Sequence, residues 1–379
     1  LQYGEYFTEK EKRLVIEACR IHDLGKANLV FQALICPELA KKIHIDVGRI
    51  SQIPHGFLSG VTISLDEFEN LSELFSEEDF EPFITAIYYH HNREDHYESP
   101  EIREYAEKYY MTQISGYLDK KIRKLNCSNL DDLLFRNNVY TGKFTVNPVV
   151  WNKYLLIKGL LNKFDYAVSA GYENAENAVD LKKKRLVKNI ENSLSGKELR
   201  PAQKFMKENR DKNLVVIAPT GSGKTEAALL WMNGEKSFYT LPLKVSSNAI
   251  YLRIKENYAY EDAALLHSDS MTMYLKEYKG NGEDISEKYE RARMLAQPLT
   301  VCTVDQLFRF VYRALGTEIF AATLKYSKLV LDEIQAYEPR VIATIIYGLK
   351  MIQEMGGKFA IITATFPPVL KYFMEQYGL

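Results

Sequence analysis

At 379 residues the chain is long enough for two domains, each with its own hydrophobic core. A composition of 46% hydrophobic and 26% charged residues is typical of a soluble globular protein, and no apolar run approaches the roughly 18 residues of a membrane span. The net charge of −1 argues against a broadly basic nucleic-acid coat protein but allows a local basic groove. Four scattered cysteines and no visible signal peptide argue against zinc ribbons and a disulfide framework and fit a reducing cytoplasm.

Residues 1–170 predict an all-α domain. Glycine and proline are sparse in this part, and no alternation of apolar and polar residues persists. Thr8 is a predicted N-cap, with Glu11 as its capping-box partner. We expect helical runs over residues 12–22, 66–75, 80–91, 101–118 and 149–170.

Six of the seven histidines lie in the first 96 residues, which indicates that the two halves do different chemistry. Taken singly, a histidine or aspartate at the end or edge of an apolar helix is more simply a cap or a solvated side chain. Four histidines and two aspartates in such places are better explained by convergence on metal ions, for which Mn, Fe, Co, Ni and Zn suit nitrogen and oxygen ligands. Two such ions can clamp the attacking and leaving oxygens of a phosphodiester. The six candidates are His22, Asp23, His55, His90, His91 and Asp165.

The order His22-Asp23-Leu24-Gly25-Lys26 resembles the signature of HD-superfamily phosphohydrolases, and the six candidates together resemble the nuclease domain of the Cas3 family of CRISPR-associated nuclease–helicases. The resemblance implies that Asp23 bridges two divalent metal ions, Mn²⁺, Fe²⁺, Co²⁺ or Ni²⁺. It also implies a division of the other ligands: His22 and Asp165 on the first metal, and His55, His90 and His91 on the second.

Two details of this resemblance concern residues around His22. Lys26 matches a family lysine that sits near the scissile phosphate. The family supplies a further histidine to the first metal from a preceding helix, and no histidine precedes His22 here. Either that histidine lies upstream of Leu1 or the first metal is weakly held. His44 and His96 do not match the family pattern, and we expect both to face solvent.

Residues 171–198 predict a polar linker with a basic patch at Lys182-Lys183-Lys184-Arg185. The patch is explained at least as well by a solvated helix face as by a path for a nucleic-acid backbone.

Residues 199–379 predict an α/β domain with a doubly wound parallel sheet, because apolar strands buried on both faces alternate with helices. Ligands of such sheets bind at the carboxyl ends of the strands. The expected strands are residues 214–218, 237–241, 263–266, 299–304, 328–331 and 359–363.

A phosphate-binding loop follows the first of these strands, as Pro219-Thr220-Gly221-Ser222-Gly223. The two glycines allow successive backbone amides to face phosphate oxygens at a helix N-terminus. Lys224 can reach the terminal phosphates, and the hydroxyl of Thr225 can hold Mg²⁺. We therefore predict that this loop binds a nucleoside triphosphate, ATP, with Mg²⁺.

Two adjacent carboxylates, Asp332 and Glu333, follow the strand over residues 328–331. Asp332 is expected to hold Mg²⁺ opposite Thr225, directly or through water. Glu333 is expected to orient or deprotonate the water that attacks the γ-phosphate.

The second half as a whole resembles the first RecA-like domain of a superfamily 2 helicase. By this resemblance, Arg200 and Gln203 form the Q-motif that reads adenine. Further matching stretches are Pro242-Leu243-Lys244 with Ser247, Asn248 and Arg253 (motif Ia), Thr303–Gln306 (motif Ic), Asp332–Gln335 (motif II) and Thr363–Thr365 (motif III). Motif II ends in Gln335 where many relatives have histidine.

The resemblance to Cas3 implies a motor that pulls single-stranded DNA and a metal site that cuts it, with the RNA-guided Cascade complex as partner. Superfamily 2 motors need a second RecA-like domain, and no such domain follows before Leu379. We therefore expect weak ATP binding and no processive unwinding from this chain alone. Two other functions stay open: a nucleotide phosphohydrolase fused to a regulatory ATPase, and a nucleic-acid remodelling helicase with an inactive metal site.

Overall fold

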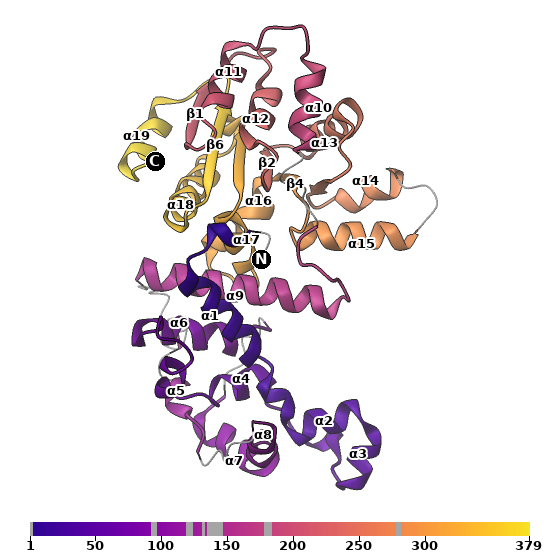
Figure 1. Ribbon diagram of the computed structural model, residues 1–379, viewed down its shortest axis with the longest axis vertical. Coiled ribbons are helices and arrows are strands. Elements are labelled where there is room, and N and C mark those ends of the chain that lie inside the picture. The colour runs from indigo at the N-terminus through magenta and orange to yellow at the C-terminus, as the bar shows by residue number, and fades with distance from the viewer. Residues whose placement is uncertain are drawn as a thin grey trace. The chain divides into compact units, whose positions relative to one another are not determined.

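The computed structural model describes residues 3–91, 97–118, 124–130, 133–134, 147–177, 184–277 and 282–379. The chain divides into two compact units, Leu1–Asp165 and Tyr166–Leu379. The first unit is helical and the second contains a sheet covered by helices (Figure 1). No helix in the described part of the chain is long and apolar enough to cross a membrane.

The first unit consists of α-helices joined by short 3-10 turns, in agreement with the predicted all-α domain. Thr8 caps α1 as expected, since the backbone N–H of Glu11 donates to its hydroxyl (3.2 Å) and the Glu11 carboxylate accepts from its backbone N–H (2.8 Å). Among the described residues the elements are α1 (Glu9–Ile21), η2 (Leu24–Ala27), α2 (Leu29–Ile35), α3 (Pro37–Lys42), α4 (His55–Gly60), α5 (Leu65–Glu69), α6 (Glu77–Tyr88), α7 (Ser99–Tyr109), α8 (Met111–Tyr117) and α9 (Pro148–Ser169), with further 3-10 turns η1 (Gly4–Tyr6), η3 (Val47–Arg49) and η4 (Cys127–Leu130).

Two of the expected helical runs differ from the structure. The run over 66–75 contains only the short helix α5, which ends at Glu69 and is followed by the C-cap Asn70, whose side-chain amide donates to the carbonyl of Asp66. The run over 101–118 breaks at Tyr110, whose backbone leaves the helical region (φ −126°, ψ −48°). The ring of Tyr110 is buried and its hydroxyl lies 2.7 Å from that of Thr62, so a tertiary contact interrupts the helical period.

Aromatic packing between α4 and α6 sets the position of the histidines in the first unit. The rings of Phe57 and Tyr88 stack with centroids 3.9 Å apart, and Phe83 and Ile87 are fully buried beside them in α6. Contacts of α4 with both η2 and α6 bring the end of α1, the start of α4 and the end of α6 together.

The second unit contains a six-stranded parallel sheet in the order β1-β6-β5-β2-β4-β3. This confirms the predicted doubly wound fold. Register pairs such as Ile217↔Thr363 and Leu241↔Thr303 bring the carboxyl ends of the strands to one edge. The strands are β1 (Leu214–Ile217), β2 (Ser237–Leu241), β3 (Ala263–Leu266), β4 (Leu299–Thr303), β5 (Lys328–Asp332) and β6 (Lys358–Thr363).

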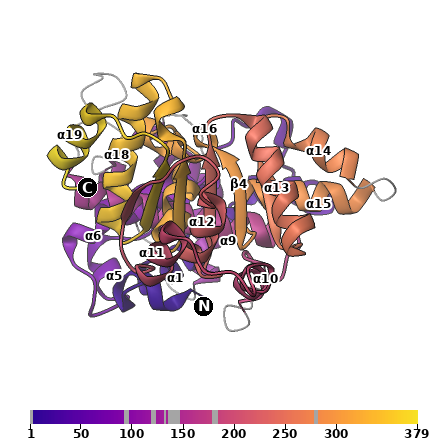
Figure 2. The same ribbon diagram turned by 90° about the horizontal axis from the view of Figure 1, so that it is seen from above.

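Helices cover both faces of this sheet, as Figure 2 shows from above. One hydrophobic core joins a face of the sheet to α10 (Arg185–Ser193), α11 (Pro201–Glu208), α12 (Lys224–Met232) and α13 (Lys244–Tyr258). On the other face α18 (Pro339–Met355) packs against β6 and α17 (Glu318–Lys325). The remaining elements are α14 (Ser270–Glu277), α15 (Gly282–Arg293), α16 (Val304–Leu307), η5 (Phe308–Tyr312), η6 (Ile334–Ala336) and α19 (Pro368–Gln376).

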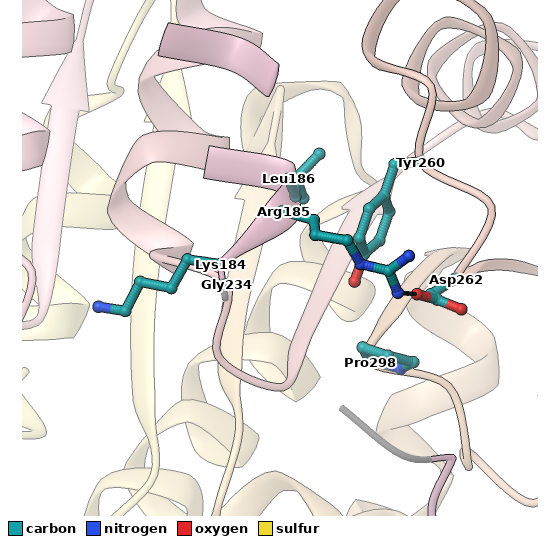
Figure 3. Close-up of a pocket in the computed structure, with 7 residues that line it drawn as sticks. All are labelled: Lys184, Arg185, Leu186, Gly234, Tyr260, Asp262 and Pro298. Carbon is teal, nitrogen blue, oxygen red and sulfur yellow. Dashed lines mark hydrogen bonds and ion pairs between the residues drawn. The ribbon is translucent and has the colours of Figure 1, made fainter. Parts of the chain in front are cut away.

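The segment expected to be a linker contains the helix α10. Leu186, Val187 and Ile190 are buried in the core of the second unit, because they recur at helical spacing. Arg185 forms an ion pair with Asp262 (Figure 3), which favours a structural role over a nucleic-acid contact for this part of the basic patch. Lys182 and Lys183 lie outside the described residues.

Candidate metal centre and nucleotide-binding site

Four histidines of the first unit meet where three helices begin or end. His22 is the C-cap of α1, and His55 is the first residue of α4. His90 and His91 follow the end of α6. The Nε2 atom of His55 lies 2.8 Å from Nε2 of His91 and 3.2 Å from Nε2 of His90. These three rings therefore offer ligand atoms to a single point.

Two aspartates join the histidines. Oδ1 of Asp23 lies 3.2 Å from Nε2 of His55, and Oδ2 of Asp23 lies 3.5 Å from Nε2 of His22. Asp165, on α9, has Oδ1 3.8 Å from Nε2 of His22. His22, Asp23 and His90 form a second group with the spacing of metal ligands. All six candidates are thus brought together, whereas His44 is exposed and His96 lies outside the described residues.

Backbone carbonyls orient two of the imidazoles. Nδ1 of His22 lies 2.9 Å from the carbonyl of Cys19, and Nδ1 of His90 lies 2.6 Å from the carbonyl of Ile87. A carbonyl can only accept, so in the neutral ring Nδ1 carries the hydrogen and Nε2 presents its lone pair to the cluster. Nε2 of His22 is buried and has no hydrogen-bond partner. A buried lone pair between two carboxylates fits a metal ligand.

The charges of the cluster also suit a cation. Burial opposes ionisation of Asp23, yet hydrogen bonds from His55 and Lys26 hold its pKa well below the ordinary value. Burial would lower the pKa of His22, but Asp165 and Asp23 outweigh it and raise that pKa, so the two carboxylates favour positive charge on this ring. Burial and the neighbouring His91 lower the pKa of His90 to about 3, which keeps this ring neutral as a ligand must be.

Ser59 is a supporting residue that the sequence reasoning missed. Its buried hydroxyl lies 2.7 Å from the carbonyl of His22 and 2.9 Å from that of His55, and it accepts from the backbone N–H of Gly25 at 2.8 Å. One side chain therefore ties together the backbones of two candidate ligands. A Cβ at Gly25 would lie 2.0 Å from the carbonyl oxygen of His55, so only glycine allows this close approach.

In the second unit, the loop 219–223 joins β1 to α12. Gly221 and Gly223 have φ of 78° and 82°, the left-handed conformation that favours glycine. The side chain of Arg200 donates to the carbonyl of Gly221, and Nε2 of Gln203 lies 3.4 Å from the carbonyl of Gly223. Both Q-motif candidates thus contact the loop. Of its other residues, Pro219 and Thr220 are exposed, Ser222 is half-buried, and Lys224 and Thr225 begin α12.

The carboxylates at the end of β5 face this loop. Nζ of Lys224 lies 2.6 Å from Oε1 of Glu333, and this lysine outweighs burial and lowers the pKa of Glu333. The hydroxyl of Tyr239, on the neighbouring strand β2, donates to Oδ2 of Asp332 at 2.7 Å. Oδ1 of Asp332 is buried without a hydrogen-bond partner, and burial raises the pKa of this group. A free, buried carboxylate oxygen at this point fits a Mg²⁺ ligand.

Gln335 connects this site to the last strand. Its amide nitrogen donates to Glu333, and its amide oxygen accepts from the hydroxyl of Thr363. Thr363 in turn lies 2.7 Å from the carbonyl of Thr365. The glutamine at the end of motif II therefore links motifs II and III. Neither this link nor the contact of Tyr239 with Asp332 is visible from residue spacing.

Comparison with known proteins supports the family prediction for each half of the chain. Residues 5–136 match the family model of the Cas3 HD domain, and residues 200–373 match that of DEAD/DEAH box helicases. The CRISPR-associated nuclease/helicase Cas3 of Methanothermobacter thermautotrophicus is 33% identical over 230 residues, which are 58% of this chain and 27% of that protein. The endonuclease/helicase Cas3 of Escherichia coli is 25% identical over 190 residues, 44% of this chain and 21% of that protein.

Solved structures share the fold. T. fusca Cas3 with AMPPNP matches 99% of this chain and 47% of its own, with a TM-score of 0.65 at 17% identity. A chain of the structure described as "CRISPR RNA-guided surveillance complex, pre-nicking" matches 99% of this chain and 44% of its own, with a TM-score of 0.56 at 16% identity. This chain thus spans less than half the length of these relatives.

The two matched families imply the use of a metal ion by the first half and of ATP by the second. The order of the two matches is that of the sequence prediction, and the cluster around His55 and the loop at Lys224 each lie within the match expected to contain it. The chain belongs to the Cas3 family of CRISPR-associated nuclease–helicases, with a Cas3 HD domain followed by a DEAD/DEAH box helicase domain.

Proposed function

We propose that the first unit is a metal-dependent nuclease that cuts single-stranded DNA, and that the second unit is part of the ATP-driven motor that delivers the strand. The observation that carries this proposal is the convergence of Asp23 with five other nitrogen and oxygen ligands, with the Nε2 atom of His22 buried between two carboxylates and without a hydrogen-bond partner.

The ligands divide into two sets. His55, His90 and His91 would hold one ion, His22 and Asp165 would hold the other, and Asp23 would bridge them. Nitrogen and oxygen donors of this kind suit Mn²⁺, Fe²⁺, Co²⁺ or Ni²⁺. When bound, two such ions supply an activated water and stabilise charge on the leaving oxygen.

Residues of the chain itself would orient the phosphodiester. Lys26 is half-buried beside the cluster, with Nζ 2.7 Å from Oδ2 of Asp23. A lysine at this point can contact a phosphate oxygen while it keeps Asp23 ionised. Lys26 would therefore position the scissile phosphate next to the carboxylate that bridges the metals.

In the second unit the backbone amides of residues 219–223 would cradle the phosphates of ATP, with Lys224 on the terminal phosphates. Thr225 and Asp332 would hold Mg²⁺, and Glu333 would orient the attacking water. The contacts of Arg200 and Gln203 with the loop support a role for both side chains in coupling adenine binding to this loop. Lys244, from motif Ia, would contact a phosphate of the strand.

The partner we propose is Cascade. A surveillance complex in a pre-nicking state contains a chain with the fold of this one. The complex would expose single-stranded DNA, and the motor would feed that strand to the metal centre.

The direct test is cleavage of circular single-stranded DNA in the presence of Mn²⁺ or Ni²⁺. We expect linear products from the natural chain, none from Asp23→Ala, and full activity from Asp66→Asn, which removes an exposed carboxylate from the same unit. Cleavage that survives Asp23→Ala would exclude the proposed site. No cleavage with any of the metals would instead favour a nucleic-acid remodelling helicase with an inactive HD domain.

A further inference from the structure

The carboxyl ends of β2, β4 and β3 lie next to one another at the edge of the sheet. Leu241 of β2 is level with Thr303 of β4, and Leu266 of β3 is level with Cys302. Lys244 begins α13 just after β2, and the loop 267–269 follows β3. The start of α13 and the loop after β3 therefore meet where we propose that the strand binds.

An ion pair joins these two segments. Nζ of Lys244 lies 2.8 Å from Oδ2 of Asp269, and the two side chains are 48% and 64% exposed. Lys244 lowers the pKa of Asp269, so this carboxylate is ionised at neutral pH. The ammonium group that would meet a strand phosphate is thus already occupied by an anion of the chain itself.

A buried histidine fixes Asp269 in this place. The backbone N–H of Asp269 donates to Nδ1 of His267 at 3.1 Å. Because Nδ1 accepts, the hydrogen of the neutral ring is on Nε2, which donates to Oδ1 of Asn248 at 2.7 Å. His267 is only 2% exposed, and Asn248 belongs to α13, the helix that begins with Lys244. The backbone of Asp269 is therefore tied to α13, the helix of its partner, which keeps the carboxylate within reach of Lys244.

We propose that Asp269 is an internal counter-ion, which occupies Lys244 in the absence of nucleic acid and is displaced by a phosphate of the bound strand. This inference rests on the proposed binding of single-stranded DNA by the second unit. Displacement of a carboxylate makes the strand break an existing ion pair before Lys244 can bind it. The cost of breaking this pair is the same for any anion that takes its place at Lys244, so it is a larger share of the binding free energy of an isolated phosphate than of a strand that also contacts other residues.

The test is a double-mutant cycle in the chain without nucleotide, with fluorescence anisotropy of a labelled oligothymidine at low salt. We expect Asp269→Asn to tighten binding about two- to fivefold, the range of one exposed ion pair. We expect no change from the same substitution in the Lys244→Met background. The matched control is Glu261→Gln, which removes a 70% exposed carboxylate 3.1 Å from Lys255, near the opposite end of β3. This control should leave the affinity unchanged.

The possible results distinguish the counter-ion role of Asp269 from strand binding itself. Equal tightening by Asp269→Asn with and without Lys244 would show a general charge effect and overturn the proposal, as would weaker binding. If the natural chain binds the oligonucleotide and neither Lys244→Met nor Asp269→Asn changes its affinity, the counter-ion is rejected while strand binding stands. If no variant binds, strand binding by this unit is itself rejected. Thermal melting of each variant identifies any loss of folding.

Discussion

Nζ of Lys224 lies 2.6 Å from Oε1 of Glu333, although 109 residues separate the two in sequence. The lysine that would contact the terminal phosphates is therefore paired with the carboxylate that would orient the attacking water. Binding of a nucleotide must exchange this carboxylate for phosphate oxygens. The pair would thus oppose nucleotide binding and keep Glu333 next to the place where hydrolysis would occur.

Replacement of Glu333 by glutamine should separate binding from hydrolysis. We expect Glu333→Gln to bind a fluorescent ATP analogue about two- to fivefold more tightly, since the charge that competes for Lys224 is gone. Phosphate release by the assembled motor should fall about 10²- to 10⁴-fold, because the water loses its base. Glu338→Gln, at an exposed position just before α18, is the control and should change neither quantity. Weaker binding by Glu333→Gln would contradict the competition.

Ser59 should matter for both stability and metal affinity. Ser59→Ala leaves the N–H of Gly25 without its acceptor, which should cost about 1–3 kcal/mol of unfolding free energy in urea. Because the same hydroxyl ties the backbones of His22 and His55, affinity for Mn²⁺ by calorimetric titration should fall about 10- to 100-fold. Ser115→Ala removes a hydroxyl that donates to Met111 in its own helix and should leave metal affinity unaltered. Equal metal affinity in Ser59→Ala would show that Ser59 only stabilises the fold.

Glycine is required at position 25 by the close approach of η2 to α4. The Cβ of Gly25→Ala would lie 2.0 Å from the backbone oxygen of His55, so the backbone must move. We expect a loss of about 1–3 kcal/mol or more, together with weaker metal binding. Gly116→Ala is the control, because a Cβ there meets no atom within 4 Å and lies in the helix α8. That variant should be neutral or slightly more stable. Similar melting temperatures for the two variants would refute the close-approach argument.

Asp79 should make the stability of the first unit depend on pH. This fully buried carboxylate bonds to Lys10 of α1 and lies 2.6 Å from Lys153 of α9. Burial opposes its ionisation, but the two lysines outweigh burial and lower its pKa. A lowered pKa in the folded state means that the contribution to stability is complete above the unfolded pKa of about 3.9 and is lost as the pH falls through the folded value.

The matching measurement compares thermal melting of the natural chain and Asp79→Asn. At about pH 7 we expect Asp79→Asn to be less stable by about 1–3 kcal/mol, because two lysines lose a charged acceptor. The difference should shrink as the pH is lowered below about 4. A difference that stays constant over this range would show that the side chain contributes by shape alone.

Much of the architecture could be predicted from local pattern. Apolar strands such as residues 237–241 and 263–266 match β2 and β3, because strands buried on both faces read as short apolar runs. The break at Tyr110 could not be predicted, since it depends on Thr62, a residue far away in sequence. In the same way α5 is shorter than its apolar period suggests.

The candidate site could likewise be predicted from the sequence only in part. The six candidate ligands could be identified because residue types that bind metal stand out at apolar helix ends and match a family signature. Their support could not be identified, because it depends on tertiary contacts. Ser59 acts through the approach of η2 to α4, Tyr239 through the pairing of β2 beside β5, and Asp269 through a loop that meets the start of α13.

The measurement that tests the account most directly is anomalous X-ray diffraction from crystals of the chain soaked in Mn²⁺. The account predicts two anomalous peaks, one contacted by His55, His90 and His91, the other by His22 and Asp165, with Asp23 between them. Both peaks should disappear or weaken strongly in Asp23→Ala. A single peak, or none, at these six residues would contradict a two-metal centre.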